Sequence, residues 1–252
     1  MGRGCRPLAL AACILGVAGC GGGHASGDLT VSAAASLKRA FTDYAGRFSP
    51  GRVRFSFAGS DVLAAQIERG VRPDLYASAN VDLPRMLYTK RLVRRPVTFA
   101  ANRLVLAAPA GSPKVRTVRD AGKVGVTLAI GSRSVPIGAY TRRVLARLGR
   151  TRSARILANV RSEEPDVGGI VGKLTTGAVD AGFTYATDVT ATGGKLRAIA
   201  LPATAQPVVA YAAAVLKGAP HPGAAARFIS GLLRGVGRSA LLRAGFLPPP
   251  RT

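Results

Sequence analysis

The chain has 252 residues, 48% of them hydrophobic, and a formal net charge of +24. This length and hydrophobic content suffice for sizeable cores, and all three cysteines lie within the first 20 residues, so the rest of the chain has no disulfide or thiol chemistry. A strongly basic charge is common in nucleic-acid-binding proteins. Here the arginines are scattered along the whole chain and no nucleic-acid-binding motif is present, so we expect no nucleic-acid partner.

Residues 1–19 have the pattern of a bacterial lipoprotein signal peptide. Two arginines precede the apolar run 8–17, which is far shorter than the roughly 20 residues of a membrane-spanning helix. The segment ends in Val-Ala-Gly-Cys20, which resembles a lipobox and predicts cleavage before Cys20 and lipidation of its sulfur. Residues 20–27 then form a glycine-rich tether. We expect an exported protein anchored to the outer face of the cell membrane; the alternative is an ordinary secretory signal with an incidental cysteine.

Strand and helix patterns alternate from Leu29 onward, which is typical of an α/β sheet with parallel strands. In the first half we predict strands over 29–32, 52–57 and 75–78, and helices over 37–48, 61–69 and 81–88. An apolar strand over 102–109 is predicted to carry the chain into a second lobe.

The second half repeats this alternation. We predict strands over 125–130, 181–185 and 208–216, and helices over 134–148, 166–174, 224–233 and 237–244. The strand over 208–216 is predicted to return the chain to the first lobe. We therefore expect one lobe to comprise 28–105 and 210–252, and the other 106–209.

The inventory of side chains excludes most enzymes. His24 lies in the tether and His221 lies between prolines, so a Ser/His/Asp triad or a zinc site is not expected. No phosphate-binding or dinucleotide-binding glycine motif is present. Glu163, Glu164 and Asp166 are interpreted as a solvated acidic loop. We expect a binding protein that is not an enzyme and needs no cofactor.

Neutral hydrogen-bond donors recur at predicted helix starts. Ser36 follows the first strand in an N-cap position, and Ser60 follows Gly59 at the next helix start. Ile137 and Val167 can each offer a backbone N–H in a first helical turn, where such groups have no partner inside the helix. Tyr185 follows an apolar strand and adds a phenol donor. Each residue alone is also explained by capping or packing, but together they predict an interlobe cleft that binds an oxyanion without a fixed counter-charge.

The same residues carry a family resemblance that covers nearly all of 28–250. The motifs are Ala33-Ala-Ala-Ser-Leu37, Phe57-Ala-Gly-Ser60, Asn102-Arg-Leu-Val-Leu106, Ser134-Val-Pro-Ile-Gly138 and Asp180-Ala-Gly-Phe-Thr-Tyr185. In this order the chain resembles the molybdate-binding receptors of bacterial ABC importers.

The resemblance implies a two-lobed periplasmic-binding-protein fold of type II. Each lobe would be a mixed, mostly parallel sheet flanked by helices, with strands near 102–108 and 208–215 as the hinge. It also implies a lipid-anchored monomer that delivers molybdate or tungstate to an ABC permease and its ATPase. Molybdenum would be held as an oxyanion and not as a free cation, and the residues that match the family's ligand-binding positions are Ser36, Ser60, Ile137, Val167 and Tyr185.

Two residues depart from the family pattern. Asp61 replaces a serine beside Ser60, and its carboxylate would repel an anion unless it points away. Ile137 replaces a smaller alanine. Two alternatives stay open: a receptor for another oxyanion or small organic anion, and a basic envelope-associated protein that binds anionic polymers.

Overall fold

The computed structural model describes residues 1–2, 28–49 and 51–250. The predicted lipidation site Cys20, the tether 20–27 and all but the first two residues of the predicted signal peptide lie outside this part. Within the described residues, no helix is both long enough and apolar enough to cross a bilayer.

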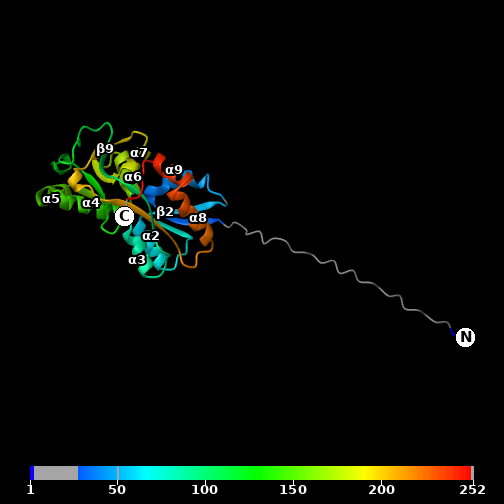
Figure 1. Cartoon of the computed structure of the whole chain (residues 1–252). Helices are drawn as coiled ribbons and strands as arrows, with labels where there is room; N and C mark the ends of the chain where they lie inside the picture. Colours follow the sequence, from blue (N-terminus) through cyan, green and yellow to red (C-terminus); the bar gives the residue numbers. More distant parts are fainter. Residues whose placement is uncertain (3–27, 50, 251–252) are drawn as a thin grey trace.

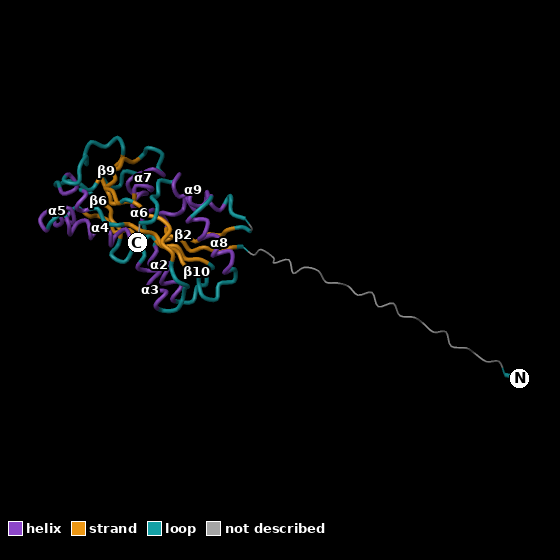
Figure 2. The backbone as a smooth tube through the Cα atoms, in the orientation of Figure 1, coloured by secondary structure: helices purple, strands orange, loops and turns teal. Residues whose placement is uncertain are grey.

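The strands form two separate five-stranded sheets, which lie in two lobes (Figures 1 and 2). The first sheet has the order β2-β1-β3-β10-β4. Its strands are β1 (Leu29–Ala34), β2 (Val53–Ala58), β3 (Leu75–Ser78), β4 (Val97–Asn102) and β10 (Val209–Val215). β1 pairs in parallel with β2 and β3, whereas β10 runs antiparallel to β3 and β4.

The second sheet has the order β7-β6-β8-β5-β9 and repeats the arrangement of the first. Its strands are β5 (Leu104–Pro109), β6 (Leu128–Gly131), β7 (Val160–Glu164), β8 (Ala181–Tyr185) and β9 (Leu196–Ala200). β6 pairs in parallel with β7 and β8, and β5 runs antiparallel to β8 and β9. The predicted fold of two lobes with mixed sheets is confirmed.

Helices cover both faces of the first sheet. They are α1 (Lys38–Ala45), α2 (Ser60–Glu68), α3 (Asp82–Thr89), α8 (Pro222–Leu233) and α9 (Val236–Arg243). Because successive strand residues point to opposite faces, Leu75 and Ala77 join the main core beneath α1 and α8, while Tyr76 packs in a smaller core under α2 and α3.

Four helices cover the second lobe. Short 3-10 turns also occur in the chain. The helices are α4 (Pro136–Arg147), α5 (Arg150–Ala158), α6 (Val167–Thr175) and α7 (Ala186–Ala191). The 3-10 turns in the described part of the chain are η1 (Ala35–Leu37), η2 (Asp120–Gly122) and η3 (Ala203–Ala205). Six of the helices (α1, α2, α3, α4, α6 and α7) follow the C-terminal end of a strand with at most five residues between. As a result, α2, α4, α6 and α7 begin, and η1 leads into α1, at the mouth between the lobes.

The chain passes between the two sheets twice within the described residues. The first passage is at Arg103, between β4 and β5, so the strand predicted over 102–109 corresponds to β5, and β4 before it was not predicted. The break is held by the Asn102 Oδ1 atom, which accepts a hydrogen bond from the Arg103 N–H at 2.8 Å. The second passage is the segment 201–208, before β10.

One element was predicted with the wrong conformation, and four, including the strand β4, were not predicted. Glu163 and Glu164 lie in β7 and do not form the expected acidic loop, because β7 is an edge strand whose side chains alternate between half-buried and exposed positions. The strand β9 and the helices α5 and α7 were absent from the prediction. α5 buries only Ile156, so its sequence lacks a strong apolar period.

Candidate functional site

A small cavity lies between the lobes, and the five residues named from the sequence all line it. They are Ser36 and Ser60 from the first lobe and Ile137, Val167 and Tyr185 from the second. The rest of the lining consists of the neighbouring small and apolar residues Ala34, Ala35, Ala58, Gly59, Ala79, Val135 and Pro136, together with Asp166. The empty space among these residues is only about 210 Å³, so the site has room for no more than a small ligand.

Ser36 lies within the turn η1 and not at the N-cap position predicted for it. Ala34 and Leu37 occupy the cap positions, and neither η1 nor α1 has a side-chain cap. The Ser36 Oγ atom instead lies 3.0 Å from the Tyr211 hydroxyl oxygen. The serine is buried by its place between the two lobes, not by a capping contact.

The hydrogen bonds around Ser36 allow its proton to point toward the cavity. Asn102 Oδ1 accepts from Arg103 N–H, which turns the Asn102 amide nitrogen toward the Tyr211 hydroxyl oxygen at 3.5 Å and the Thr187 hydroxyl oxygen at 2.9 Å. When the Tyr211 hydroxyl oxygen accepts the hydrogen bond from the Asn102 amide, the Tyr211 O–H can donate to Ser36 Oγ. The Ser36 hydroxyl then keeps its own proton for a ligand.

Ser60 is prepared in the same way. It is the first residue of α2, is 1% exposed, and its Oγ accepts a hydrogen bond from the Ala79 N–H at 3.1 Å. Its carbonyl oxygen accepts from the Tyr76 hydroxyl at 2.7 Å, which fixes the start of the helix. Because the Oγ atom already accepts from the backbone, its proton is free to donate into the cavity.

Ile137 and Val167 supply backbone groups at two helix starts in the second lobe. Val167 is the first residue of α6, and Ile137 follows Pro136 at the start of α4. The first N–H groups of a helix have no intrahelical partner and lie at the positive end of the helix dipole. Both side chains are buried, so only the backbone of each residue is suited to hold a polar ligand.

Tyr185 brings a phenol with no partner. Its side chain is 1% exposed, and its hydroxyl oxygen makes no hydrogen bond within the described structure. Burial raises the pKa of Tyr185 well above its usual value, and the nearby Tyr211 and Tyr140 reinforce this shift. The phenol therefore keeps its proton at neutral pH. A buried polar group without a partner costs stability, so this hydroxyl is a vacant donor.

The carboxylates near the cavity are engaged or turned aside. Asp166 caps α6, and its Oδ1 accepts from the N–H groups of Gly168 at 2.7 Å and Gly169 at 3.2 Å. Asp61 is not among the residues that line the cavity. Its Oδ1 is buried without a hydrogen-bond partner and lies toward the backbone of Gly59.

Asp188 lies behind Tyr185 in the first turn of α7, and its Oδ2 accepts from the Tyr185 N–H at 3.3 Å. Burial raises the pKa of Asp188 to about 8; the hydrogen bond from Tyr185 lowers it and the charge of Asp166 raises it. The carboxyl is therefore neutral at pH 7 and adds no negative charge beside the cavity there.

Gly59 permits the close approach of the two lobes. A Cβ atom at this position would lie 2.4 Å from the Pro165 carbonyl oxygen, which precedes α6 in the second lobe. The backbone of Gly59, at φ −57° and ψ 137°, is open to any residue. The glycine is therefore required by the contact between lobes and not by backbone conformation.

The residues that hold the serines were not identified from the sequence. Asn102 is bonded to Thr187, which lies 85 residues away along the chain, and to Tyr211, which lies 109 residues away. Tyr211 lies 175 residues from Ser36. No local pattern marks such partners. Asp166 carried a usable signal, since an aspartate followed by Val-Gly-Gly at a helix start fits an N-cap.

The site as a whole offers neutral donors and no reactive group. Three hydroxyl donors and two helix starts face one small cavity, with no lysine or arginine in the lining. Among the described residues, no cluster of three or more histidine, cysteine, aspartate or glutamate side chains could hold a metal cation. The arrangement suits a desolvated anion.

Comparison with known proteins places the chain in a family. Residues 29–247 match the family model of bacterial extracellular solute-binding proteins. The chain is 35% identical over 228 residues to the molybdate-binding protein ModA of Mycobacterium tuberculosis, covering 88% of this chain and 85% of that protein. It is 30% identical over 204 residues to ModA of Escherichia coli, covering 76% and 78%. The periplasmic molybdate-binding protein of Azotobacter vinelandii has the same fold, with a TM-score of 0.79 at 21% identity, covering 88% of this chain and all of that one.

The chain belongs to the bacterial extracellular solute-binding proteins. The resemblance inferred from its motifs is confirmed, and so is the expectation of a binding protein and not an enzyme. The family is one of extracellular proteins, in agreement with the predicted export.

Proposed function

We propose that the protein is an extracytoplasmic receptor for molybdate or tungstate. Ser36, Ser60 and Tyr185 would donate their hydroxyl protons to the oxyanion, and Ile137 and Val167 their backbone N–H groups. The observation that carries this proposal is that five neutral donors from both lobes line one cavity of about 210 Å³ that contains no cationic side chain. Two relatives at 30% identity or more, each covered over more than two thirds of its length, are molybdate-binding proteins.

The energetics of such a site are adequate. A hydrogen bond to a charged group contributes about 1.5–3 kcal/mol. Five of them provide about 8–15 kcal/mol, against an association cost of roughly 4–15 kcal/mol. Micromolar affinity, which requires about −8 kcal/mol, follows when the donors are held in place before the ligand arrives. The bonds from Tyr211 to Ser36 and from Ala79 to Ser60 hold them in this way.

The proposal extends to attachment and delivery. The Val-Ala-Gly-Cys20 sequence supports a lipid anchor at Cys20 on the outer face of the cell membrane. The protein would act as a monomer and pass its ion to an ABC permease driven by a separate ATPase. Metabolic labelling with a radioactive fatty acid, compared between the wild type and a Cys20→Ala variant, tests the anchor: label that persists in the variant contradicts it.

Calorimetry on the chain from residue 28 tests the ligand. Molybdate and tungstate should each give a saturable one-to-one signal, whereas sulfate and phosphate should bind much more weakly. The comparison is sharp because all four are tetrahedral oxyanions and differ chiefly in size. Binding of sulfate or phosphate with no signal from molybdate would refute the assignment.

A further inference from the structure

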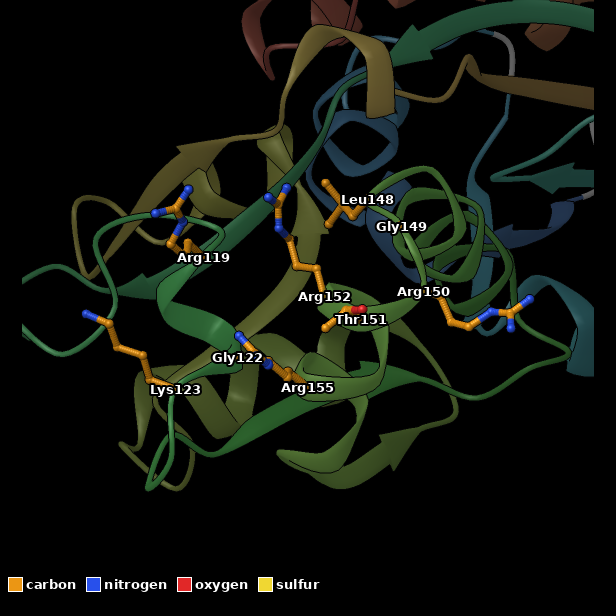
Figure 3. Close-up of a pocket in the computed structure, with 9 residues that line it drawn as sticks. All are labelled: Arg119, Gly122, Lys123, Leu148, Gly149, Arg150, Thr151, Arg152 and Arg155. Atoms are coloured by element: carbon orange, nitrogen blue, oxygen red, sulfur yellow. The ribbon is translucent and has the colours of Figure 1, made fainter.

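A strongly basic cavity lies on the second lobe, away from the interlobe site. It is formed between η2 and the start of α5 and has an empty volume of about 1090 Å³ (Figure 3). Its cationic side chains, which we call the basic cluster, are Arg119, Lys123, Arg150, Arg152 and Arg155. In the close-up the side chains of Arg119 and Arg152 rise on the same side of the cavity, while Arg150 extends away from the others.

The charges of the basic cluster are almost unopposed. Lys123 pairs with Asp120 at 2.6 Å. Within the described part of the chain, the four arginines of the cluster form no ion pair with a carboxylate. All five side chains are exposed. Apart from the Lys123–Asp120 pair, the positive charges therefore gather here without internal neutralisation.

The helix that carries three of these arginines adds to the positive potential. α5 begins after Gly149, has no side-chain cap and has no acidic residue in its first turn. A cation at a helix N-terminus is unfavourable, because it adds to the positive end of the dipole. Arg152 and Arg155 are also three residues apart, a spacing at which like charges repel. The repulsion between these positive charges lowers the stability of the protein on its own. A bound anion would reduce this repulsion.

We propose that the basic cluster binds a multivalent anionic polymer, a chain of repeated phosphate groups. A single small anion gains little from exposed cations that are screened by salt. A chain of phosphates can instead contact several arginines at once and release several counterions. The cavity is also about five times the volume of the interlobe cavity, so it suits an extended ligand and not the small oxyanion.

The position of the cluster favours a polymer of the cell envelope over lipid headgroups. Figure 1 shows α5 at one end of the molecule and the start of β1 toward the other end. This choice alone rests on the proposed anchoring: a protein attached at Cys20 can present α5 away from the membrane, toward polymers outside it.

The test compares two double variants of the chain from residue 28. Arg152→Gln with Arg155→Gln removes two cluster charges, and Arg227→Gln with Arg238→Gln removes two exposed charges from α8 and α9, so both variants have the same net charge. The probe is a linear inorganic polyphosphate. We expect the cluster variant to lose about tenfold or more in affinity and the slope of log K against log salt to fall by about 1.5 to 2. The control variant should change by less than about threefold, and neither should lose thermal stability, since exposed substitutions seldom do.

Several outcomes would overturn the proposal. Equal losses in the two variants would mean that the overall charge, and not the cluster, binds the polymer. Equal affinity for orthophosphate and polyphosphate would mean a small-anion site. Tighter binding to vesicles of anionic phospholipid, or to a DNA duplex of equal phosphate number, would assign the cluster to another partner. Molybdate calorimetry on the cluster variant separates this inference from the proposed function, because the two cavities share no residue.

Discussion

At the scale of single residues, the three hydroxyls of the interlobe cavity differ in what they do without a ligand. The Ser60 oxygen accepts a hydrogen bond from the Ala79 N–H and the Ser36 hydroxyl is bonded to the Tyr211 hydroxyl, whereas the Tyr185 hydroxyl has no hydrogen-bond partner among the described residues. Their substitutions should therefore separate ligand binding from stability.

Tyr185→Phe should weaken molybdate binding and leave the unliganded protein unharmed. Removing one bond to a charged ligand is expected to cost about 1.5–3 kcal/mol, or roughly 10- to 150-fold in affinity. No protein hydrogen bond is lost, so the melting temperature should stay constant or rise. Calorimetry and thermal unfolding measure the two quantities. Unchanged affinity would remove Tyr185 from the proposed site.

Ser60→Ala should lower both quantities. The variant loses a donor to the ligand and also strands the buried Ala79 N–H, which costs about 1–3 kcal/mol of unfolding free energy. Denaturant unfolding of the unliganded variant, beside that of Tyr185→Phe, gives the comparison. Equal stability of the two variants would contradict the hydrogen-bond assignment at Ser60.

Asp188 should make binding depend on pH. Its pKa of about 8 lies above the ordinary value, so the carboxyl is protonated at pH 7 and gains charge beside Tyr185 as the pH rises through about 8. Affinity for an anion should fall across that range. Between about pH 4 and 8 the unfolded chain has released this proton and the folded chain has not, so folding stability also declines as the pH rises.

Asp188→Asn is the matched test because it keeps the acceptor for the Tyr185 N–H. Titrations with molybdate from pH 6.5 to 9.5 should show a flat affinity in the variant and a decline in the wild type. A decline of equal size in both proteins would assign the effect to another group.

At the scale of elements, the two lobes present the same structure twice. β1, β2 and β3 correspond in sheet order to β6, β7 and β8. Ser36 and Ile137 follow the first strand of each set, and Ser60 and Val167 follow the second. Ala79 follows the third strand of the first lobe, and Tyr185 is the last residue of the third strand of the second lobe. Strand ends of open α/β sheets are where ligands bind, and here two sets of strand ends meet at one cavity.

The lobes also share a pair of hydrogen bonds at the strand ends that lie away from the cavity. Asp74, before β3, accepts hydrogen bonds from the N–H and hydroxyl of Thr30 at 2.8 Å each. Asp180, before β8, accepts the same two bonds from Thr127, again at 2.8 Å each. Each Asp–Thr pair joins two neighbouring strands far from the cavity. The strand ends that carry the site can therefore face the other lobe.

Gly59→Ala should prevent the lobes from closing. The added Cβ would lie 2.4 Å from the Pro165 carbonyl oxygen, while the backbone conformation suits alanine. We expect at least about a tenfold loss of molybdate affinity with no loss of stability in the open form. Small-angle scattering should show no compaction on adding ligand. Gly46→Ala is the control, since its Cβ would meet nothing closer than 3.7 Å.

The sequence was most informative where burial is most complete. The inner strands β1, β3, β8 and β10 are buried along most of their length and were predicted from their apolar runs. The edge strands β4, β7 and β9 were missed; in β7 and β9 one face meets solvent and takes charged residues such as Glu163 and Arg197. The cavity residues were found through local motifs at strand ends. Their supporting partners Asn102 and Tyr211 come from distant parts of the chain and leave no local trace.

At the scale of the whole molecule, the positive charge should speed the capture of anions. The chain keeps a formal charge of +22 after removal of residues 1–19, although no cation lines the interlobe cavity. A field of this sign steers anions to the protein without adding to the bonds that hold them. The association rate of molybdate should therefore fall with ionic strength while the dissociation rate stays nearly constant.

Stopped-flow fluorescence can follow this, because the chain has six tyrosines and no tryptophan, and Tyr185 and Tyr211 lie at the cleft. Between low and physiological salt the association rate should fall by roughly three- to tenfold, as screening shortens the reach of the field to about 8 Å. A change confined to the dissociation rate would contradict the steering argument.

The double passage of the chain between the sheets, at Arg103 and through 201–208, has a mechanical consequence. Two covalent connections allow the lobes to rotate relative to one another, and an ion bonded to both lobes adds a third connection that restricts this rotation. The bound ion therefore acts as a reversible cross-link between the lobes. The lifetime of the closed arrangement is then set by the residence time of one small ion.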